Sequence, residues 1–243
     1  MMAPRLYPIL LYPGSRIRNV IIRLNIASQV LATSNNPGKP MHLALEQHHV
    51  EGARLYGDRK DMVRALRASE HGVIAEIGVA LGDFSDFLIK ELRPTKFIAF
   101  DIFTMHESPV IWGRPSSELF TGLTQMQFFQ KRFASHGDQV ALEIGSSQQT
   151  LARYPDTYFD MIYIDAAHDY ESVRADAALA SQKIKPTGTI IFNDYIMHDH
   201  VTGSPYGVVQ AVNEFINNNP WRVVGMSLQR DMFCDLAIQK MPG

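Results

Sequence analysis

Cysteine, long apolar runs and an excess of either charge are scarce in this sequence. Cys234 is the single cysteine among 243 residues, so an internal disulfide is excluded and a reducing compartment, the cytoplasm, is expected. No apolar run approaches the roughly 20 residues that a membrane-spanning helix needs. The net charge of −2 gives no general reason to expect nucleic acid as a partner. The composition, 46% hydrophobic and 20% charged, is ordinary for a globular protein.

Acidic residues are absent from residues 1–40, although this basic N-terminal arm carries five basic side chains. Three interpretations of the arm stay open. It can pack on the domain or on a second subunit, lie as a helix on an anionic membrane surface, or be a cleavable presequence. The first interpretation implies a homo-oligomer formed through the arm. A turn-rich segment, residues 34–40, ends it, so we expect one domain over residues 41–243.

Short apolar runs and helical patterns alternate along this domain. Residues 41–71 have a helical pattern, and the runs typical of strands are residues 73–77, 97–100, 140–144, 159–164, 189–192, 221–227 and 233–238. The alternation predicts an α/β fold with a doubly wound, mostly parallel sheet. About five residues separate the last two runs, which is too few for a parallel crossover, so they should form an antiparallel hairpin.

Polar or glycine-rich groups follow five of these runs. They are residues 76–82, Asp101, Ser146–Ser147, Asp165–His168 and Asn193–Asp194. Because the carboxyl ends of the strands in an open α/β sheet meet at one crevice, residues that are distant in sequence should come together there. The sequence therefore predicts an enzyme with a nucleotide-like cofactor.

The turn after the first run holds Glu76, Gly78 and Gly82 in the pattern Glu-x-Gly-x-x-x-Gly. A glycine-rich turn lets the backbone approach a ligand closely. The dinucleotide fingerprint needs glycines where this chain has Ala80 and Asp83, so an NAD(P) site is disfavoured. Glu76 instead suits a ligand that carries positive charge.

Asp101 ends the second run, and a carboxylate there can accept both hydroxyls of a ribose or, alternatively, cap a turn. The glycine turn, Asp101, Phe159–Asp165 and Lys185–Gly188 form an ordered series that resembles the class I S-adenosylmethionine-dependent methyltransferases. The resemblance covers about residues 58–240. It implies a seven-stranded, Rossmann-like sheet of order 3-2-1-4-5-7-6 with strand 7 antiparallel.

The same resemblance implies S-adenosylmethionine as the cofactor. Gly78 and Gly82 would flank its methionine part, and Asp101 would hold its ribose. Ser146 and Ser147 would lie by its adenine.

Asp165 and His168 lie three residues apart after the fourth run, so they can share one side of the pocket if a helix begins there. Histidine, with a pKa near 6.5, can take a hydroxyl proton near neutral pH. Asp165, Asn193 and Asp194 offer oxygen ligands that suit Mg²⁺, or else Mn²⁺ or Ca²⁺. Plainer roles stay open: a helix cap for Asp165, a turn residue for His168, and a turn for Asn193–Asp194.

The segment Ile-Asp-x-x-His-x-Tyr, followed by Asn193–Asp194, resembles small-molecule O-methyltransferases, including metal-dependent enzymes that act on macrolide sugars or catechols. This resemblance implies Asp165 and Asp194 as metal ligands and His168 as the base. Asn193 departs from the pattern, because related sugar enzymes often have Asp there and catechol-type enzymes have Asp followed by Asn.

The predicted function is methyl transfer to a hydroxyl of a sugar or other small molecule, with assistance from a divalent metal. Two alternatives are a hydroxylase-like or hydrolytic enzyme of the same fold and a non-catalytic S-adenosylmethionine-binding protein. Two long segments, residues 102–115 and 195–206, can act as lids over the site.

Overall fold

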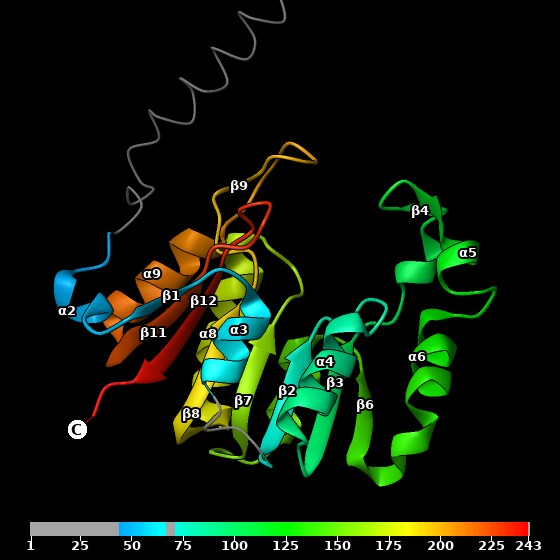
Figure 1. Ribbon diagram of the computed structural model, residues 1–243, viewed down its shortest axis with the longest axis horizontal. Helices are drawn as coiled ribbons and strands as arrows, with labels where there is room; N and C mark the ends of the chain where they lie inside the picture. Colours follow the sequence, from blue (N-terminus) through cyan, green and yellow to red (C-terminus); the bar gives the residue numbers. More distant parts are fainter. Residues whose placement is uncertain (1–43, 67–70, 243) are drawn as a thin grey trace, which may run out of the picture. The chain divides into compact units, whose positions relative to one another are not determined.

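The computed structural model describes residues 44–66 and 71–242 (Figure 1). The predicted basic arm, residues 1–40, lies outside the described residues. A sheet of eight strands forms the centre, in the order β1-β11-β12-β8-β7-β2-β3-β6. In that order the strands are Arg54–Tyr56, Trp221–Ser227, Asp235–Lys240, Ile184–Phe192, Phe159–Ile164, Val73–Ile77, Lys96–Asp101 and Val140–Ile144.

Strand β12 runs antiparallel to both of its neighbours, β11 and β8, and the remaining pairs in this sheet are parallel. The predicted mostly parallel sheet and its C-terminal hairpin are therefore confirmed. The sequence did not predict β1, which pairs with β11 at the edge of the sheet.

The prediction of one helical segment over residues 41–71 was wrong. The described part of that segment instead holds α2 (Gln47–Val50), β1 and α3 (Arg59–Ala65). Gly52 has a φ of 77°, a conformation that favours glycine and interrupts a right-handed helix. Asp58 then starts a new helix, because its side chain accepts a hydrogen bond from the Lys60 backbone N at 2.7 Å.

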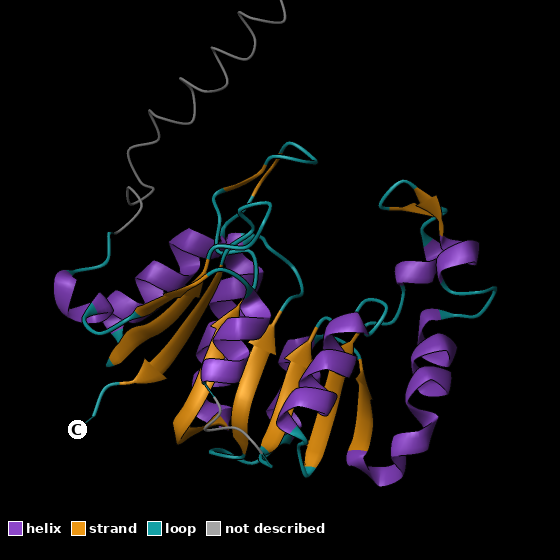
Figure 2. Ribbon diagram, viewed as in Figure 1, coloured by secondary structure: helices purple, strands orange, loops and turns teal. Residues whose placement is uncertain are grey.

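Helices cover both faces of the sheet (Figure 2). Helices α3, α4 (Asp83–Leu92) and α6 (Gln125–Phe133) pack on one face, while α8 (Tyr170–Lys183) and α9 (Val208–Asn218) pack on the other. Successive residues of a strand alternate between the two cores, as Ile74 and Ala75 do in β2. Both faces of the central strands are thus apolar and buried, which gives the Rossmann-like arrangement.

Two small hairpins project beyond the carboxyl ends of the parallel strands (Figure 1). One is β4 (Val110–Ile111) with β5 (Arg114–Pro115), and the other is β9 (His198–Asp199) with β10 (Ser204–Pro205). They lie in the two segments predicted as lids. Short helical turns complete the described elements: η2 (Met105–Glu107), α5 (Ser116–Leu119), η3 (Ala134–Gln139), α7 (Ser147–Thr150) and η4 (Leu151–Arg153).

The helices of the described segments are too short or too polar for any of them to cross a membrane.

Candidate functional site

Two adjoining cavities open at the carboxyl ends of the strands. The first has a volume of about 380 Å³ and the second about 500 Å³. They share the lining residues Gly78, Ala80, Met105, Asp165 and Ala166, which are contributed by the turn after β2, the start of η2 and the end of β7. The predicted crevice is therefore present, and it is divided into two parts.

Gly78 stands where the two cavities meet. Its φ is 83°, and a Cβ there would lie 1.9 Å from the Asp165 carbonyl oxygen, so a side chain would collide with the end of β7. Gly82 also has a positive φ, 78°, but it packs against Phe129 and Phe133 of α6 and begins α4. The first glycine thus shapes the crevice, and the second joins α4 to the aromatic core.

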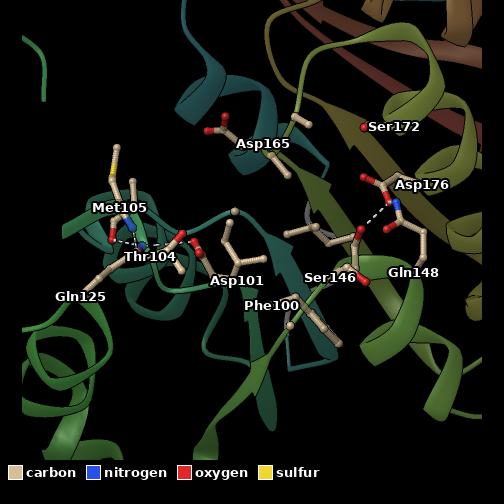
Figure 3. Close-up of a pocket in the computed structure, with 18 residues that line it drawn as sticks. Phe100, Asp101, Thr104, Met105, Gln125, Ser146, Gln148, Asp165, Ser172 and Asp176 are labelled. Carbon is tan, nitrogen blue, oxygen red and sulfur yellow. Dashed lines mark hydrogen bonds between the residues drawn. The ribbon is translucent and has the colours of Figure 1, made fainter. Parts of the chain in front are cut away.

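Asp101 borders the first cavity at the end of β3 (Figure 3). Its Oδ2 accepts hydrogen bonds from the Val79 backbone N at 2.9 Å and from Gln125 Nε2 at 3.3 Å, and its Oδ1 accepts one from the Phe103 backbone N at 2.7 Å. These bonds fix the carboxylate between two loops. Because each carboxylate oxygen has two lone pairs, Oδ1 retains one for a ligand hydroxyl.

Ser146, Gln148 and Asp176 lie at the other end of the first cavity (Figure 3). Ser147 also lines this cavity. Asp176 accepts hydrogen bonds from Ser147 and Gln148, at 2.6 and 2.8 Å, on its Oδ1. Sequence reasoning missed Asp176 and Gln148. A signal for Asp176 existed, because it is an acid on the apolar face of α8 that Val173, Ala177 and Ala180 define.

Glu76 is almost fully buried and borders the second cavity. Burial raises the pKa of its carboxyl to about 8, although the hydrogen bond from the Ser85 hydroxyl works in the opposite direction. A cationic ligand beside Glu76 would favour its ionised form, so the position suits a positively charged group.

His168 and two carboxylates meet in the second cavity. His168 Nε2 lies 3.5 Å from Asp194 Oδ2 and 3.9 Å from Asp165 Oδ1. This nitrogen is buried and has no hydrogen-bond partner within the described chain. The ring stacks on Tyr206, with centroids 4.5 Å apart and an interplanar angle of 13°. The imidazole is therefore held in place while its Nε2 is left for a ligand.

Burial and like charges perturb the ionisation of this group. Burial lowers the pKa of His168. It raises the pKa of Asp165 to about 7, with a further contribution from the negative charge of Asp194, and raises the pKa of Asp194 to about 6. Strongly perturbed titratable groups in one cavity are typical of functional sites.

Asn193 lines the second cavity, and its amide nitrogen is held by the buried core beside it. Its Nδ2 donates hydrogen bonds to Asp235 Oδ1 at 3.1 Å and to the Tyr163 hydroxyl at 3.3 Å, both of which are fully buried. Arg59 Nη1 also donates to Tyr163, at 3.1 Å, and lies 3.9 Å from Asp165 Oδ2. Sequence reasoning missed Arg59, Tyr163 and Asp235, because three separate elements bring them together.

The middle of the chain matches a known family. Residues 75–195 match the family model described as a methyltransferase domain. The chain carries a methyltransferase domain. The match includes Gly78, Asp101, Asp165 and His168, whereas Arg59 and Asp235 lie outside it.

Solved structures share the fold of this methyltransferase domain at low sequence identity. The O-methyltransferase TomG from Streptomyces achromogenes, which is involved in tomaymycin synthesis and was solved with S-adenosylmethionine, is 16% identical over 90% of this chain and 89% of that chain, with a TM-score of 0.54. An O-methyltransferase from Bacillus cereus, solved with S-adenosylhomocysteine, is 17% identical over 90% and 91%, with a TM-score of 0.50.

A protein assigned as an rRNA methylase from Clostridium thermocellum is 15% identical over 76% of this chain and 94% of its own, with a TM-score of 0.52. These likenesses show the fold, which enzymes with different acceptors share. The search of curated proteins returned no match to this chain.

The residues predicted as metal ligands, Asp165, Asn193 and Asp194, all line the second cavity. Across residues 44–66 and 71–242, no group of three or more His, Cys, Asp or Glu side chains could hold a metal ion. The amide nitrogen of Asn193 is committed to Asp235, and Arg59 places a guanidinium beside Asp165.

Proposed function

We propose that this protein transfers a methyl group from S-adenosylmethionine to a hydroxyl of a small molecule, with His168 as the base. One observation carries the proposal. The buried Nε2 of His168, which lacks a partner among the described residues, lies in the second cavity, and this cavity adjoins the first cavity, which Asp101 borders. A base must stand close to both the acceptor and the methyl group, and this arrangement provides that proximity.

The cofactor would occupy the first cavity and end at the boundary between the two. The ribose hydroxyls would bind Asp101, the adenine would lie near Ser146 and Ser147, and the methionine part would pass Gly78. Its ammonium group would then approach Glu76, whose raised pKa indicates a carboxyl that gains from a neighbouring positive charge. The TomG and Bacillus cereus structures, which hold the methyl donor and its product, support this choice of ligand.

The proposed reaction balances as an in-line displacement. The acceptor oxygen forms a bond to the methyl carbon, the bond from that carbon to sulfur breaks, and the hydroxyl proton passes to His168 Nε2. Because burial lowers the pKa of His168, the ring is neutral at physiological pH and can accept that proton. The carboxylate of Asp194, 3.5 Å away, would stabilise the imidazolium that forms.

Metal assistance stays a prediction of the sequence, and the geometry offers Arg59 as a different source of positive charge beside Asp165. Sugars and secondary metabolites likewise stay the predicted acceptor class. Trp112, His168 and Tyr206 are among the residues that line the second cavity. Such a mixed polar and aromatic lining supports a small polar acceptor.

Calorimetric titration with S-adenosylhomocysteine, and with NAD⁺ as the comparison, tests the cofactor. We expect saturable binding of the first and none of the second. Turnover of labelled methyl donor with a panel of hydroxylated acceptors then tests the reaction. Binding without methyl transfer to any acceptor would favour a non-catalytic S-adenosylmethionine-binding protein, and no binding would remove the proposal.

A further inference from the structure

A buried chain of hydrogen bonds runs from the start of β12 toward His168. Asp235 begins β12 and is fully buried. Three side chains donate hydrogen bonds to its carboxyl: the Tyr163 hydroxyl and Gln229 Nε2, both at 2.5 Å, and Asn193 Nδ2 at 3.1 Å. The proposed reaction uses none of these groups. Because donors converge on Asp235 from three sides, its oxygens serve as acceptors.

The Asp235 carboxyl fixes the direction of the Asn193 amide. Asn193 Nδ2 carries two hydrogens, and both have acceptors, one in Asp235 Oδ1 and the other in the Tyr163 oxygen at 3.3 Å. A flipped amide would set its carbonyl oxygen against the carboxylate of Asp235 and leave both oxygens without a donor between them. The carbonyl oxygen of Asn193 is therefore turned away from Asp235.

That carbonyl oxygen meets His168. Asn193 and His168 line the second cavity together, and they also share a smaller void beside it. Burial lowers the pKa of His168, and a hydrogen bond with the Asn193 side chain acts in the opposite direction. Because His168 Nε2 has no partner in the part of the chain that the structure describes, the nitrogen that makes this bond is Nδ1. With both amide hydrogens of Asn193 in use, Nδ1 must be the donor.

We propose that Asp235 and Asn193 are positioning residues that hold neutral His168 in the tautomer with its hydrogen on Nδ1, so that the lone pair of Nε2 faces the acceptor hydroxyl. The inference rests on the proposed function, because it deepens the role of His168 as the base. A neutral imidazole has one basic nitrogen, and only this tautomer places it at the unpartnered position in the second cavity.

The same chain accounts for asparagine at position 193. An aspartate there would bring a second carboxylate against Asp235 and would supply no hydrogen to it or to Tyr163. The amide does both tasks, since its nitrogen donates to the core and its oxygen accepts from His168.

A competing explanation is that Asp235 only ties β12 to β7 and β8. Ser227→Ala is the matched control for that explanation. Ser227 is fully buried on β11, and its Oγ accepts a hydrogen bond from the Asp235 backbone N at 3.2 Å. This bond is to the backbone rather than to the carboxyl, and Ser227 does not line the second cavity. The control therefore loosens the same hairpin without changing what Asn193 meets.

The experiment is ¹⁵N NMR of the imidazole nitrogens in the full chain without ligand, at about pH 8.5. At that pH His168 is neutral, and the Asp235 carboxyl, whose pKa burial raises to about 7, is ionised. Protonated and unprotonated imidazole nitrogens have well-separated chemical shifts, so the spectrum reports the tautomer. His168→Gln identifies the signals of His168 among those of the nine histidines. Wild type should show a protonated Nδ1 and an unprotonated Nε2.

Asp235→Asn and Asn193→Leu should each turn His168 into a mixture of tautomers. The first keeps the size of the side chain but lets the Asn193 amide turn, and the second removes the acceptor. In steady-state methyl transfer each should lower kcat by about 10- to 100-fold, less than loss of the base itself, and leave KM for the acceptor within about twofold. Ser227→Ala should keep the tautomer and kcat, and thermal unfolding should show that the variants fold.

Three results would overturn the inference. The first is a wild type with the hydrogen on Nε2, a readout that does not depend on any variant folding. The second is a tautomer that persists in both Asp235→Asn and Asn193→Leu, and the third is its equal loss in Ser227→Ala; either would make the chain a structural tie. All three leave the methyl transfer itself untouched. Full kcat in His168→Gln would instead overturn the proposed base, and with it the part of Asp235 and Asn193 in catalysis, while the measured tautomer would stand.

Discussion

The two cavities differ in how fully their polar groups are satisfied. In the first, Asp101 accepts three hydrogen bonds and Asp176 accepts two. In the second, His168 Nε2 has no partner in the described chain, and burial raises the pKa of Glu76 and Asp165. A fixed hydrogen-bond framework suits the binding of one constant ligand, whereas groups with perturbed pKa values suit proton transfer.

The cavities also differ in where their residues come from. The described residues that line the first cavity all fall within residues 75–195, the part that matches the methyltransferase family. The second cavity adds Arg59 from α3, Tyr206 from the end of the β9–β10 hairpin, and Gln229 and Phe233 from the loop between β11 and β12. The first cavity is therefore built by the segment that matches the family, and the second is completed by elements on either side of that segment.

Replacing His168 should give the largest effect. A small effect would contradict the assignment of proton transfer to the second cavity. We expect His168→Gln to lower kcat by about 10³-fold, within the range for loss of a general base, because no other described group has a free basic nitrogen in the second cavity. The dissociation constant for S-adenosylhomocysteine should change by less than about twofold. Single-turnover kinetics and calorimetry measure the two quantities.

His198→Gln is the control for that variant, since His198 is an exposed histidine on β9 at the same edge of the sheet. The pH profile gives a second readout. Because burial lowers the pKa of His168, the base is neutral above that pKa and activity should fall only below pH 6.5. An acidic limb that is unchanged in His168→Gln would assign the proton transfer to another group.

A change in the first cavity should act on binding rather than on chemistry. Asp101→Asn keeps the size of the side chain but replaces one acceptor oxygen by a donor, which would face the backbone N–H of Val79 or Phe103. We expect the affinity for S-adenosylhomocysteine to fall by about 30- to 100-fold, the equivalent of one or two hydrogen bonds to a charged group. Calorimetry measures this, with Asp86→Asn as the control, since the half-buried Asp86 lies on α4 and borders neither cavity. Unchanged affinity would remove the ribose role.

Local patterns in the sequence were sufficient for most of the fold and for the outline of the crevice. Apolar runs of strand length, and the close approach that requires glycine at position 78, predict β2 and the turn after it. Strand β1 was missed because three residues, Arg54–Tyr56, are too few to show alternation, and their pairing partner lies about 170 residues away in β11.

The partners of the site residues were harder to predict. The sequence offers Asn193 as an oxygen ligand, but it does not show that Asp235 and Tyr163, from two other strands, hold its amide nitrogen. Arg59 reaches Asp165 only because α3 packs beside α4. The guanidinium carbon of Arg59 lies 4.3 Å from the centroid of the Phe84 ring on α4. Such partners depend on tertiary packing, so no local pattern reports them.

A smaller effect should appear in the melting temperature. Glu76, which borders the second cavity, is buried, so its ionisation in the absence of a ligand destabilises the folded protein. The folded-state pKa of Glu76 is raised from 4.5 to about 8, so its contribution to stability is fully present below pH 4.5 and is lost as the pH rises toward 8. We expect Glu76→Gln to melt a few degrees higher than wild type near pH 8 and to lose that advantage near pH 5. Differential scanning calorimetry without ligand measures both.

The control for that experiment is the exposed Glu118→Gln, which should melt like wild type at both pH values. A Glu76→Gln protein whose melting temperature follows the wild-type pH dependence would show that Glu76 ionises freely when folded. Titration with S-adenosylhomocysteine sharpens the comparison, because the variant that gains stability should lose affinity for the ligand's ammonium group.

Chelation should have the smallest effect, and it tests where the positive charge of the second cavity comes from. The Arg59 guanidinium lies 3.9 Å from Asp165 Oδ2 and stacks on Phe84, so a fixed cation already stands beside that carboxylate. We expect exhaustive chelation to change the initial rate by less than about twofold, and Arg59→Met to lower the rate by about tenfold or more.

The opposite outcome of chelation is as informative. If chelation abolishes activity and Mg²⁺ restores it, then Arg59 must move aside when the ion binds, and the ligands predicted from the sequence regain their role. Mn²⁺ titration followed by paramagnetic resonance separates the two arrangements. In the arrangement described here wild type binds Mn²⁺ no better than Asp165→Asn, because the guanidinium excludes the ion; with a metal centre, Asp165→Asn and Asp194→Asn each weaken Mn²⁺ binding strongly. The second cavity would then resemble the first, because its carboxylates would also have bonding partners once the metal ion is bound.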